Sequence, residues 1–343
     1  MAGRRNGPRT VAIAASACLL ASCLSTPSTA GLTDGNVVLA RQGSFEAGGT
    51  ALGNPASSSL SCDHGHVEYQ IPANARATKL FLWHSSSAAV WQRNWAGGEG
   101  FQTKLLRQGY PTYIWDGPRV GRANWGCEAY TYEPAAGRDQ GNFGAWRLGP
   151  SFGTFYEGIQ FPTDDPGALE QANRARYLEF DTIANAQLET DAAAVAIDEI
   201  GPSVLLTNSA GGFRALLTRL KSDNVAGIVA YENPGYIFPE SMAGDRRVGP
   251  FGPVYVSDEE FARLTQIPIQ IVWGDYIDSS ESWTDFYELS QEFARVVNER
   301  GGQVEILKLR DAGLEGNTHI PFADLNNEEI SKVLFQWLEA KGF

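Results

Sequence analysis

The chain has 343 residues, 43% of them hydrophobic, and a net charge of −13 at pH 7. This is enough apolar material for one large α/β domain or two smaller ones. The net negative charge and the lack of a basic patch or an RNA-binding motif in the sequence argue against nucleic acid as a partner.

The first residues have the pattern of an export signal rather than of a folded domain. Arg4, Arg5 and Arg9 precede an apolar run at 11–20. The run is too short to span a membrane but has the length of a signal-peptide core. We therefore expect residues 1–22 to be a signal peptide and the protein to be exported.

Two cleavage sites follow this apolar run. Residues 20–23 read Leu-Ala-Ser-Cys and resemble a bacterial lipoprotein processing site, at which Cys23 would be lipidated and anchor the protein to a membrane. Ordinary cleavage after Ala30 is the alternative, and it would release a secreted protein. We favour the lipoprotein, with the Ser/Thr/Gly-rich residues 23–35 as a tether.

The remaining cysteines indicate a disulfide, and the histidines give little indication of a metal site. Cys62 and Cys127 are left in the mature chain, and in an oxidising compartment we expect them to form a disulfide. Two separate buried thiols are the alternative. Of the four histidines only His64 and His66 are close in sequence, and a surface turn is favoured there over a metal site.

The first half of the mature chain alternates between strand and helix patterns. Strands are expected at 37–40, 43–45, 66–71 and 79–83, a Gly/Ser-rich loop at 48–61, a helix at 100–108 and a further strand at 112–116. The last strand–helix–strand spacing predicts a right-handed βαβ unit of a parallel sheet.

This pattern is lost between 117 and about 166, where glycine and aromatic residues replace any amphipathic period. The aromatic residues are Trp125, Tyr130, Tyr132, Phe143, Trp146, Phe152, Phe155, Tyr156 and Phe161. Long loops in compact domains are usually functional. We interpret 117–185 as a cap whose aromatic side chains line an acyl or ring pocket; the alternative is that they pack the cap onto the sheet. Amphipathic helices are expected from 168 and at 188–200.

A strand-to-helix turn then presents a serine. Residues 203–207 form a short apolar run, 213–220 repeat at helical spacing, and Ser209 lies on the turn between them. Small neighbours allow the tight backbone of a nucleophile elbow, which exposes the hydroxyl beside a helix N-terminus. Thr207 stands where the motif Gly-x-Ser-x-Gly has its first glycine. An ordinary strand–helix turn is the alternative.

The rest of the chain again alternates between strand and helix patterns. Strands are expected at 225–231, 267–273 and 304–309, helices at 282–300 and 326–340, and a second cap insertion at about 233–262. This order predicts a single α/β domain over 36–343 with one mostly parallel, doubly wound sheet.

Polar residues gather where the predicted strands end. Ser209, Glu232 and Asp275 each follow a strand, and His319 follows the last one. Sites in open α/β sheets form at these carboxyl ends, and the order serine, acid, histidine is that of the α/β-hydrolases. A serine hydroxyl needs a neutral imidazole to take its proton, and a buried carboxylate to orient the imidazole.

The chain resembles a small group of exported bacterial esterases within the α/β-hydrolase superfamily. The matching stretches are Gly43–Gly49, Val67–Pro72, Gly109–Tyr113, Asp116–Arg122, the Ser209 elbow, Glu232–Gly235 and Gly316–His319. The resemblance implies a triad of Ser209, Glu232 and His319, because in that group the acid follows the strand after the elbow. Asp275, at the position commoner in the superfamily, is the alternative acid.

The loop after the strand at 79–83 departs from that group. The group has His-Gly and a vicinal cysteine pair, whereas this chain has a histidine followed by Ser85, Ser86 and Ser87. By position the resemblance implies that backbone N–H groups of Ser86 and Ala210 form the oxyanion hole, with Ser85 as an alternative donor. Arg119 and Arg122 lie in a matching stretch, and we interpret them as structural, pairing with acids.

These features predict an exported serine carboxylic-ester hydrolase that acts through an acyl-enzyme on a small, hydrophobic ester or lactone. No cofactor is implied. The alternative is a catalytically silent hydrolase fold used as a ligand-binding lipoprotein, since a glycine is lost both at the elbow and in the oxyanion loop.

Overall fold

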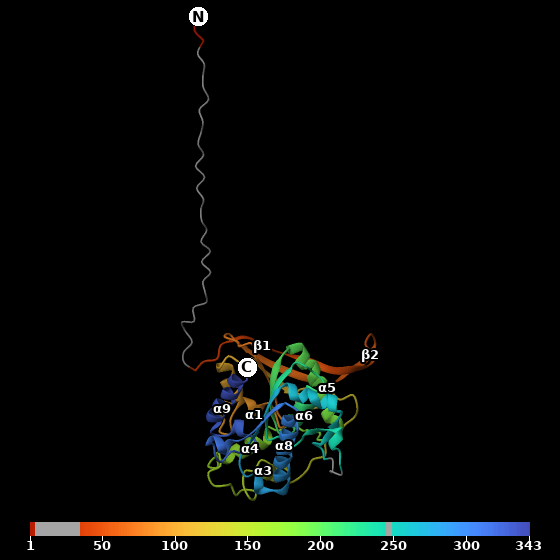
Figure 1. Cartoon of the computed structure of the whole chain (residues 1–343), viewed down its shortest axis with the longest axis vertical. Coiled ribbons are helices and arrows are strands. Elements are labelled where there is room, and N and C mark those ends of the chain that lie inside the picture. Colours follow the sequence, from red (N-terminus) through yellow and green to blue (C-terminus); the bar gives the residue numbers. More distant parts are fainter. Residues whose placement is uncertain (4–34, 245–248) are drawn as a thin grey trace. The chain divides into compact units, whose positions relative to one another are not determined.

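An eight-stranded sheet forms the centre of the computed structural model, which describes residues 1–3, 35–244 and 249–343 (Figure 1). The strand order is β1-β2-β4-β3-β5-β6-β9-β10. β2 is antiparallel to both of its neighbours, and the strands from β4 to β10 are parallel. The predicted signal peptide, Cys23 and most of the tether lie outside the described residues.

The elements have the following bounds. The strands of the large sheet are β1 Leu39–Asn54, β2 Ser58–Pro72, β3 Lys79–Trp83, β4 Thr112–Asp116, β5 Ser203–Asn208, β6 Val225–Tyr231, β9 Pro268–Trp273 and β10 Gln303–Lys308, and a small sheet pairs β7 Ile237–Pro239 with β8 Val254–Val256. The α-helices are α1 Ala89–Gln92, α2 Phe101–Arg107, α3 Arg138–Ala145, α4 Pro166–Arg174, α5 Ile183–Ile200, α6 Ala210–Arg219, α7 Asp258–Ala262, α8 Glu281–Glu299 and α9 Asn327–Ala340. Short 3₁₀ turns are η1 Glu240–Met242, η2 Arg263–Gln266, η3 Ile277–Ser279, η4 Leu309–Ala312 and η5 Pro321–Ala323.

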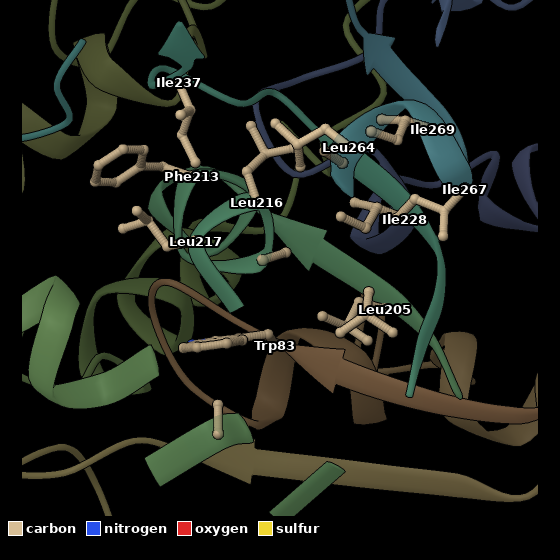
Figure 2. Packing of buried hydrophobic residues seen from close by; sticks show 14 of the residues in the cluster. Trp83, Leu205, Phe213, Leu216, Leu217, Ile228, Ile237, Leu264, Ile267 and Ile269 are labelled. Carbon is tan, nitrogen blue, oxygen red and sulfur yellow. The ribbon is translucent and has the colours of Figure 1, made fainter. Parts of the chain in front are cut away.

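Helices cover both faces of the sheet, which explains why its central strands are apolar throughout. One core joins α5, α6 and α8 to the sheet, and the other joins α1, α2 and α9 to it. Figure 2 shows Phe213, Leu216 and Leu217 of α6 beside Leu205 and Ile228 of the sheet. A strand buried on both faces loses the alternation of a half-exposed strand and becomes a continuous hydrophobic run.

The first two strands are longer than the sequence pattern predicts. Residues 48–61, predicted to be a loop, continue β1 and β2 as a hairpin whose pairing runs from Thr50 with Cys62 to Asn54 with Ser58. Most of its side chains are exposed, so backbone hydrogen bonds rather than burial hold it together. A hydrophobic period in a sequence arises where one face of a strand is buried, so the exposed residues of this hairpin gave no strand signal.

The described chain contains no helix that is both long and apolar enough to cross a membrane.

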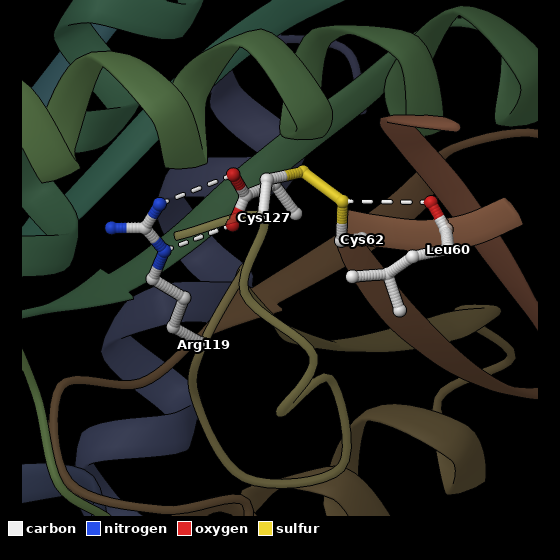
Figure 3. Close-up of a disulfide and its surroundings, with 5 residues drawn as sticks. Leu60, Cys62, Arg119 and Cys127 are labelled. Atoms are coloured by element: carbon white, nitrogen blue, oxygen red, sulfur yellow. Dashed lines mark hydrogen bonds and ion pairs between the residues drawn. A yellow bond between two sulfur atoms is a disulfide. The ribbon is translucent and has the colours of Figure 1, made fainter. Parts of the chain in front are cut away.

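A disulfide joins Cys62 on β2 to Cys127 in the cap, as predicted (Figure 3). Beside it, Asp63 accepts hydrogen bonds from the Arg119 guanidinium at 2.9 and 3.1 Å. Arg119 therefore pairs with an acid, as the sequence analysis proposes. The two contacts tie the irregular cap to a long strand.

Replacing both Cys62 and Cys127 by serine is expected to lower the free energy of unfolding by about 2–4 kcal/mol. The cysteines are 65 residues apart, so the cross-link removes much of the loop entropy of the unfolded chain. Urea unfolding of the oxidised protein and the double variant measures the difference. Equal midpoints and slopes would contradict it.

Candidate active site

Ser209 lies between β5 and α6 in a strained backbone conformation. Its φ and ψ are 50° and −128°, a region that side chains rarely adopt and that is typical of a nucleophile elbow. Gly212 is needed beside it, because a Cβ there would lie 2.7 Å from the Asn233 side chain. The strain places the hydroxyl at the carboxyl end of a central strand.

Thr207 fits the elbow although the motif has a glycine at this position. A Cβ on Gly211 would lie 3.5 Å from the Thr207 Cβ and 2.9 Å from the carbonyl oxygen of Trp83. The first distance is ordinary van der Waals contact, so the Thr207 side chain leaves room for the turn, and the close approach that requires Gly211 is the one to the end of β3. The missing first glycine therefore does not prevent the turn.

His319 lies against Glu232 from the next strand. Its Nδ1 is 3.5 Å from Glu232 Oε2, and both side chains are nearly or fully buried. The His319 backbone is held at both ends, since its N–H donates to the Trp146 carbonyl at 3.0 Å and its carbonyl accepts from Asn208 Nδ2 at 3.1 Å. The loop that carries His319 is thus fixed to both the cap and the elbow strand.

The Glu232 carboxylate has two further partners. Arg147 Nη2 lies 2.7 Å from Oε2, with both side chains fully buried, and the N–H of Gly274 donates to Oε1. Arg147 also donates from Nε to the Asp275 carbonyl at 2.7 Å and stacks over the Trp283 ring at 4.8 Å. Sequence reasoning missed Arg147, because it lies in the irregular cap and no periodic signal connects it to the sheet.

The charges around the pair set its protonation. Burial raises the pKa of Glu232, but Arg147, His319 and the Gly274 N–H outweigh it and lower the pKa below its usual value. Burial lowers the pKa of His319 despite the opposing effect of Glu232, and Arg147 lowers it further. At neutral pH the site therefore holds an ionised glutamate beside a neutral imidazole, the state in which a histidine can accept a proton.

Asp275 faces away from this pair. Its Oδ1 accepts from Arg310 Nε at 2.7 Å, and its Oδ2 accepts from the Gly316 N–H at 2.5 Å. These contacts hold the turn before His319. Of the two acids weighed from the sequence, Glu232 is the one whose carboxylate lies within ion-pair distance of the imidazole.

The loop after β3 is buried and well anchored. His84 Nε2 lies 2.8 Å from Asp116 Oδ1, and the Ser86 carbonyl accepts from the Tyr177 N–H at 2.7 Å. Asp116 also binds Arg122 Nε at 2.7 Å, so Arg122 pairs with an acid as the sequence analysis proposes. Without the cysteine pair of the resembling group, this loop is held by a histidine–aspartate contact.

A cavity of about 230 Å³ brings these residues together. Its lining includes Ser85, Ser86, Ser209, Ala210 and His319, so the predicted nucleophile, histidine and oxyanion donors share one space. Charged and polar residues of the cap also line the cavity: Arg138, Asn142, Arg176, Glu179 and Asp181.

Most of the aromatic residues that line the cavity are not the ones predicted from the sequence. Among the cap aromatics of the described chain, Trp146 alone lines the cavity, and Phe251, Trp283 and Phe286 supply the other rings. Most of the remaining cap aromatics are packed against each other or exposed: Phe143, Phe155 and Phe161 form ring contacts, while Trp125, Tyr132 and Phe152 are at least half exposed. The packing alternative therefore holds for the core rings Phe143, Phe155 and Phe161, whereas the exposed rings neither line the cavity nor pack the cap onto the sheet.

Comparisons with known proteins agree with this architecture. No family model matches the chain. A probable secreted lipase, phiG, of a fungus (Fungal sp., strain ATCC 74256) is 22% identical, with 80% of this chain and 85% of the lipase aligned. A solved structure described as a novel bacterial esterase superposes with a TM-score of 0.75 at 22% identity, covering 91% of this chain and 99% of the esterase. An esterase of Pyrococcus furiosus, Pf2001, aligns at a TM-score of 0.44 and 14% identity, over 88% and 91% of the two chains.

The strand order, the elbow between β5 and α6 and the superposition on the bacterial esterase agree with one another. The chain has the α/β-hydrolase fold.

Proposed function

We propose that the protein is an exported serine carboxylic-ester hydrolase with Ser209, His319 and Glu232 as its catalytic triad. The observation that carries the proposal is the buried His319–Glu232 pair, 3.5 Å apart, in the same cavity as a strained Ser209. A strained serine and a buried, charge-compensated imidazole are costly to keep in a fold that does not use them.

In the proposed mechanism Ser209 Oγ attacks the ester carbonyl while His319 takes its proton. Since Nδ1 of His319 faces Glu232, Nε2 is the nitrogen left for the serine hydroxyl. Glu232 holds that tautomer and stabilises the imidazolium, and His319 then donates the proton to the leaving alcohol. Water, deprotonated by the same imidazole, hydrolyses the acyl-enzyme.

Backbone N–H groups of Ser86 and Ala210 are the proposed oxyanion donors. Ala210 is the first residue of α6, so its N–H lies at a helix N-terminus, where developing negative charge is favourable. Both residues line the cavity with Ser209. The proposal assigns no step to a cofactor, and the cavity size suits a small ester or lactone.

Export and anchoring are part of the proposal. The similarity to a probable secreted lipase supports ester hydrolysis outside the cell. The leader pattern and Cys23 support a bacterial lipoprotein, with ordinary cleavage after Ala30 as the alternative.

Two measurements on the purified protein test the activity: hydrolysis of short and medium-chain p-nitrophenyl esters, and labelling of Ser209 by a fluorophosphonate located by peptide mass spectrometry. Both are expected to be positive, because an activated serine attacks either electrophile. A folded sample that neither turns over esters nor is labelled would instead support the silent, ligand-binding lipoprotein.

The pH dependence of kcat/KM follows from the His319 contacts. The neutral imidazole is the active form, so activity is expected to rise with pH through the pKa of His319 and then level off. Burial lowers that pKa from its usual value near 6.5, so the midpoint is expected below pH 6.5. Initial rates from pH 4.5 to 8.5 measure it, and a midpoint clearly above 7 would contradict the neutral, buried imidazole.

A further inference from the structure

Besides the Ser86 hydroxyl and His319 Nδ1, three hydrogen-bond donors that line the catalytic cavity have no partner among the described residues. They are Nε and Nη1 of Arg176 and Nδ2 of Asn142, and all three are buried from solvent. Both residues line the cavity with Ser209. Buried donors without a partner are rare, because each has given up its hydrogen bonds to water. Acceptor atoms of a bound molecule would satisfy them.

Arg176 also forms no ion pair with a described residue. No carboxylate of the described chain lies within 4.0 Å of its guanidinium, which packs over the Trp146 ring at 5.3 Å. Burial lowers the pKa of Arg176 and the charge of Arg138 lowers it further, and the opposing charges of Glu179, Asp139 and Asp181 offset this only in part. Arg138, which lines the same cavity, likewise forms no ion pair with a described residue. Two cations therefore line the cavity without an ion pair to a described residue.

The acids of the cavity are already engaged. Glu179 and Asp181 each lie 3.6 Å from Arg214, a buried residue of α6 that also contacts Glu189 at 3.0 Å. Burial raises the pKa of Glu179, and it raises the pKa of Glu189 to about 8, although the Arg214 charge opposes both shifts. The two acids that line the cavity thus form their ion pairs with Arg214, whereas Arg176 forms no ion pair with them.

Arg176 lies close to the reacting groups. Its neighbour in sequence, Tyr177, donates its N–H to the Ser86 carbonyl, which ties this segment to the proposed oxyanion loop. The pKa of His319, lowered chiefly by burial, is lowered further by the Arg176 charge. An anion bound by Arg176 would therefore belong to the molecule that Ser209 attacks.

We propose that Arg176, assisted by Asn142, binds a carboxylate carried by the substrate, so that the enzyme prefers short monoanionic esters to neutral ones. A guanidinium presents its N–H groups in a planar fork that matches a carboxylate, and Arg138 adds a second positive charge. The cavity of about 230 Å³ suits a short ester such as a monoester of a dicarboxylic acid. This inference rests on the proposed ester hydrolysis.

The kinetic test compares two monoanionic esters with their neutral ethyl esters. Monoethyl glutarate carries the carboxylate in the acyl part, and butyryloxyacetate carries it in the alcohol part. We expect a higher kcat/KM for at least one monoanion than for its neutral ester, measured as initial rates of proton release at constant pH. In Arg176→Gln that preference is expected to fall by about 10- to 100-fold, and Arg176→Lys is expected to be intermediate.

Arg174→Gln is the matched control. It removes the same charge two residues away, but Arg174 is 68% exposed and pairs with Glu170 at the surface. The preference of Arg174→Gln for the monoanionic over the neutral ester is expected to equal that of the unaltered protein. Circular dichroism and thermal unfolding of each variant show whether it is folded.

A binding measurement separates this inference from the proposed hydrolysis. Calorimetry with the Ser209→Ala protein is expected to show binding of the preferred monoanion that is about 10- to 100-fold weaker once Arg176→Gln is added. If binding of the monoanion depends on Arg176 but the unaltered protein hydrolyses no ester, the carboxylate site is supported and the proposed hydrolase activity is wrong. If Ser209-dependent hydrolysis occurs but neither the preference nor the binding depends on Arg176, the inference is overturned.

Discussion

Ser209→Ala is expected to lower kcat for a p-nitrophenyl ester by on the order of 10⁶-fold. Without Oγ no acyl-enzyme can form, and the remaining rate would come from binding and the oxyanion donors alone. The substitution keeps a Cβ in the same strained backbone, with φ of 50°, so the thermal unfolding midpoint is expected to stay within about 2 °C. Steady-state kinetics and thermal unfolding measure the two effects.

Ser151→Ala is the control for that experiment, since Ser151 is an exposed residue of the cap outside the cavity. It is expected to leave turnover and fluorophosphonate labelling unchanged. If Ser209→Ala kept the original rate and labelling, another nucleophile would carry the reaction and the triad would be wrong.

Glu232→Gln is expected to lower kcat by about 10⁴-fold. A glutamine can present its amide N–H to His319 Nδ1, which favours the wrong tautomer and removes the charge that stabilises the imidazolium. The change also leaves Arg147 without its buried carboxylate at 2.7 Å, so the free energy of unfolding is expected to fall by about 3–5 kcal/mol. Activity is therefore measured below the unfolding transition found for the variant.

Asp275→Asn is the matched substitution for the competing acid. Asp275 contacts Arg310 and the Gly316 N–H rather than the imidazole. The expected loss is about 1–3 kcal/mol of stability, with kcat lowered by no more than about 10-fold. A larger kcat loss in Asp275→Asn than in Glu232→Gln would reverse the assignment of the acid.

Much of the fold could be predicted because its central strands are buried on both faces. The runs at 79–83, 112–116 and 203–207 are apolar for that reason, and the amphipathic α8 and α9 lie close to the ranges expected from helical spacing. The hairpin over 48–61 could not be predicted in this way, because its exposed strands carry no hydrophobic period.

The residues of the candidate site, too, could be predicted from the sequence only in part. That Ser209, Glu232 and His319 follow strand ends in this order could be predicted from the sequence, because local turn chemistry and the parallel topology bring those ends to one edge of the sheet.

The tertiary structure places Glu232 rather than Asp275 within ion-pair distance of the imidazole. Nothing in the sequence predicts that Arg147 lies 2.7 Å from Glu232, or that Arg176 lines the same cavity without an ion pair to a described residue. Both arginines come from the cap, which forms no strand of the large sheet. Their contacts join residues far apart in sequence, and no local propensity or spacing encodes such contacts. Packing of the whole chain is the physical cause that places them.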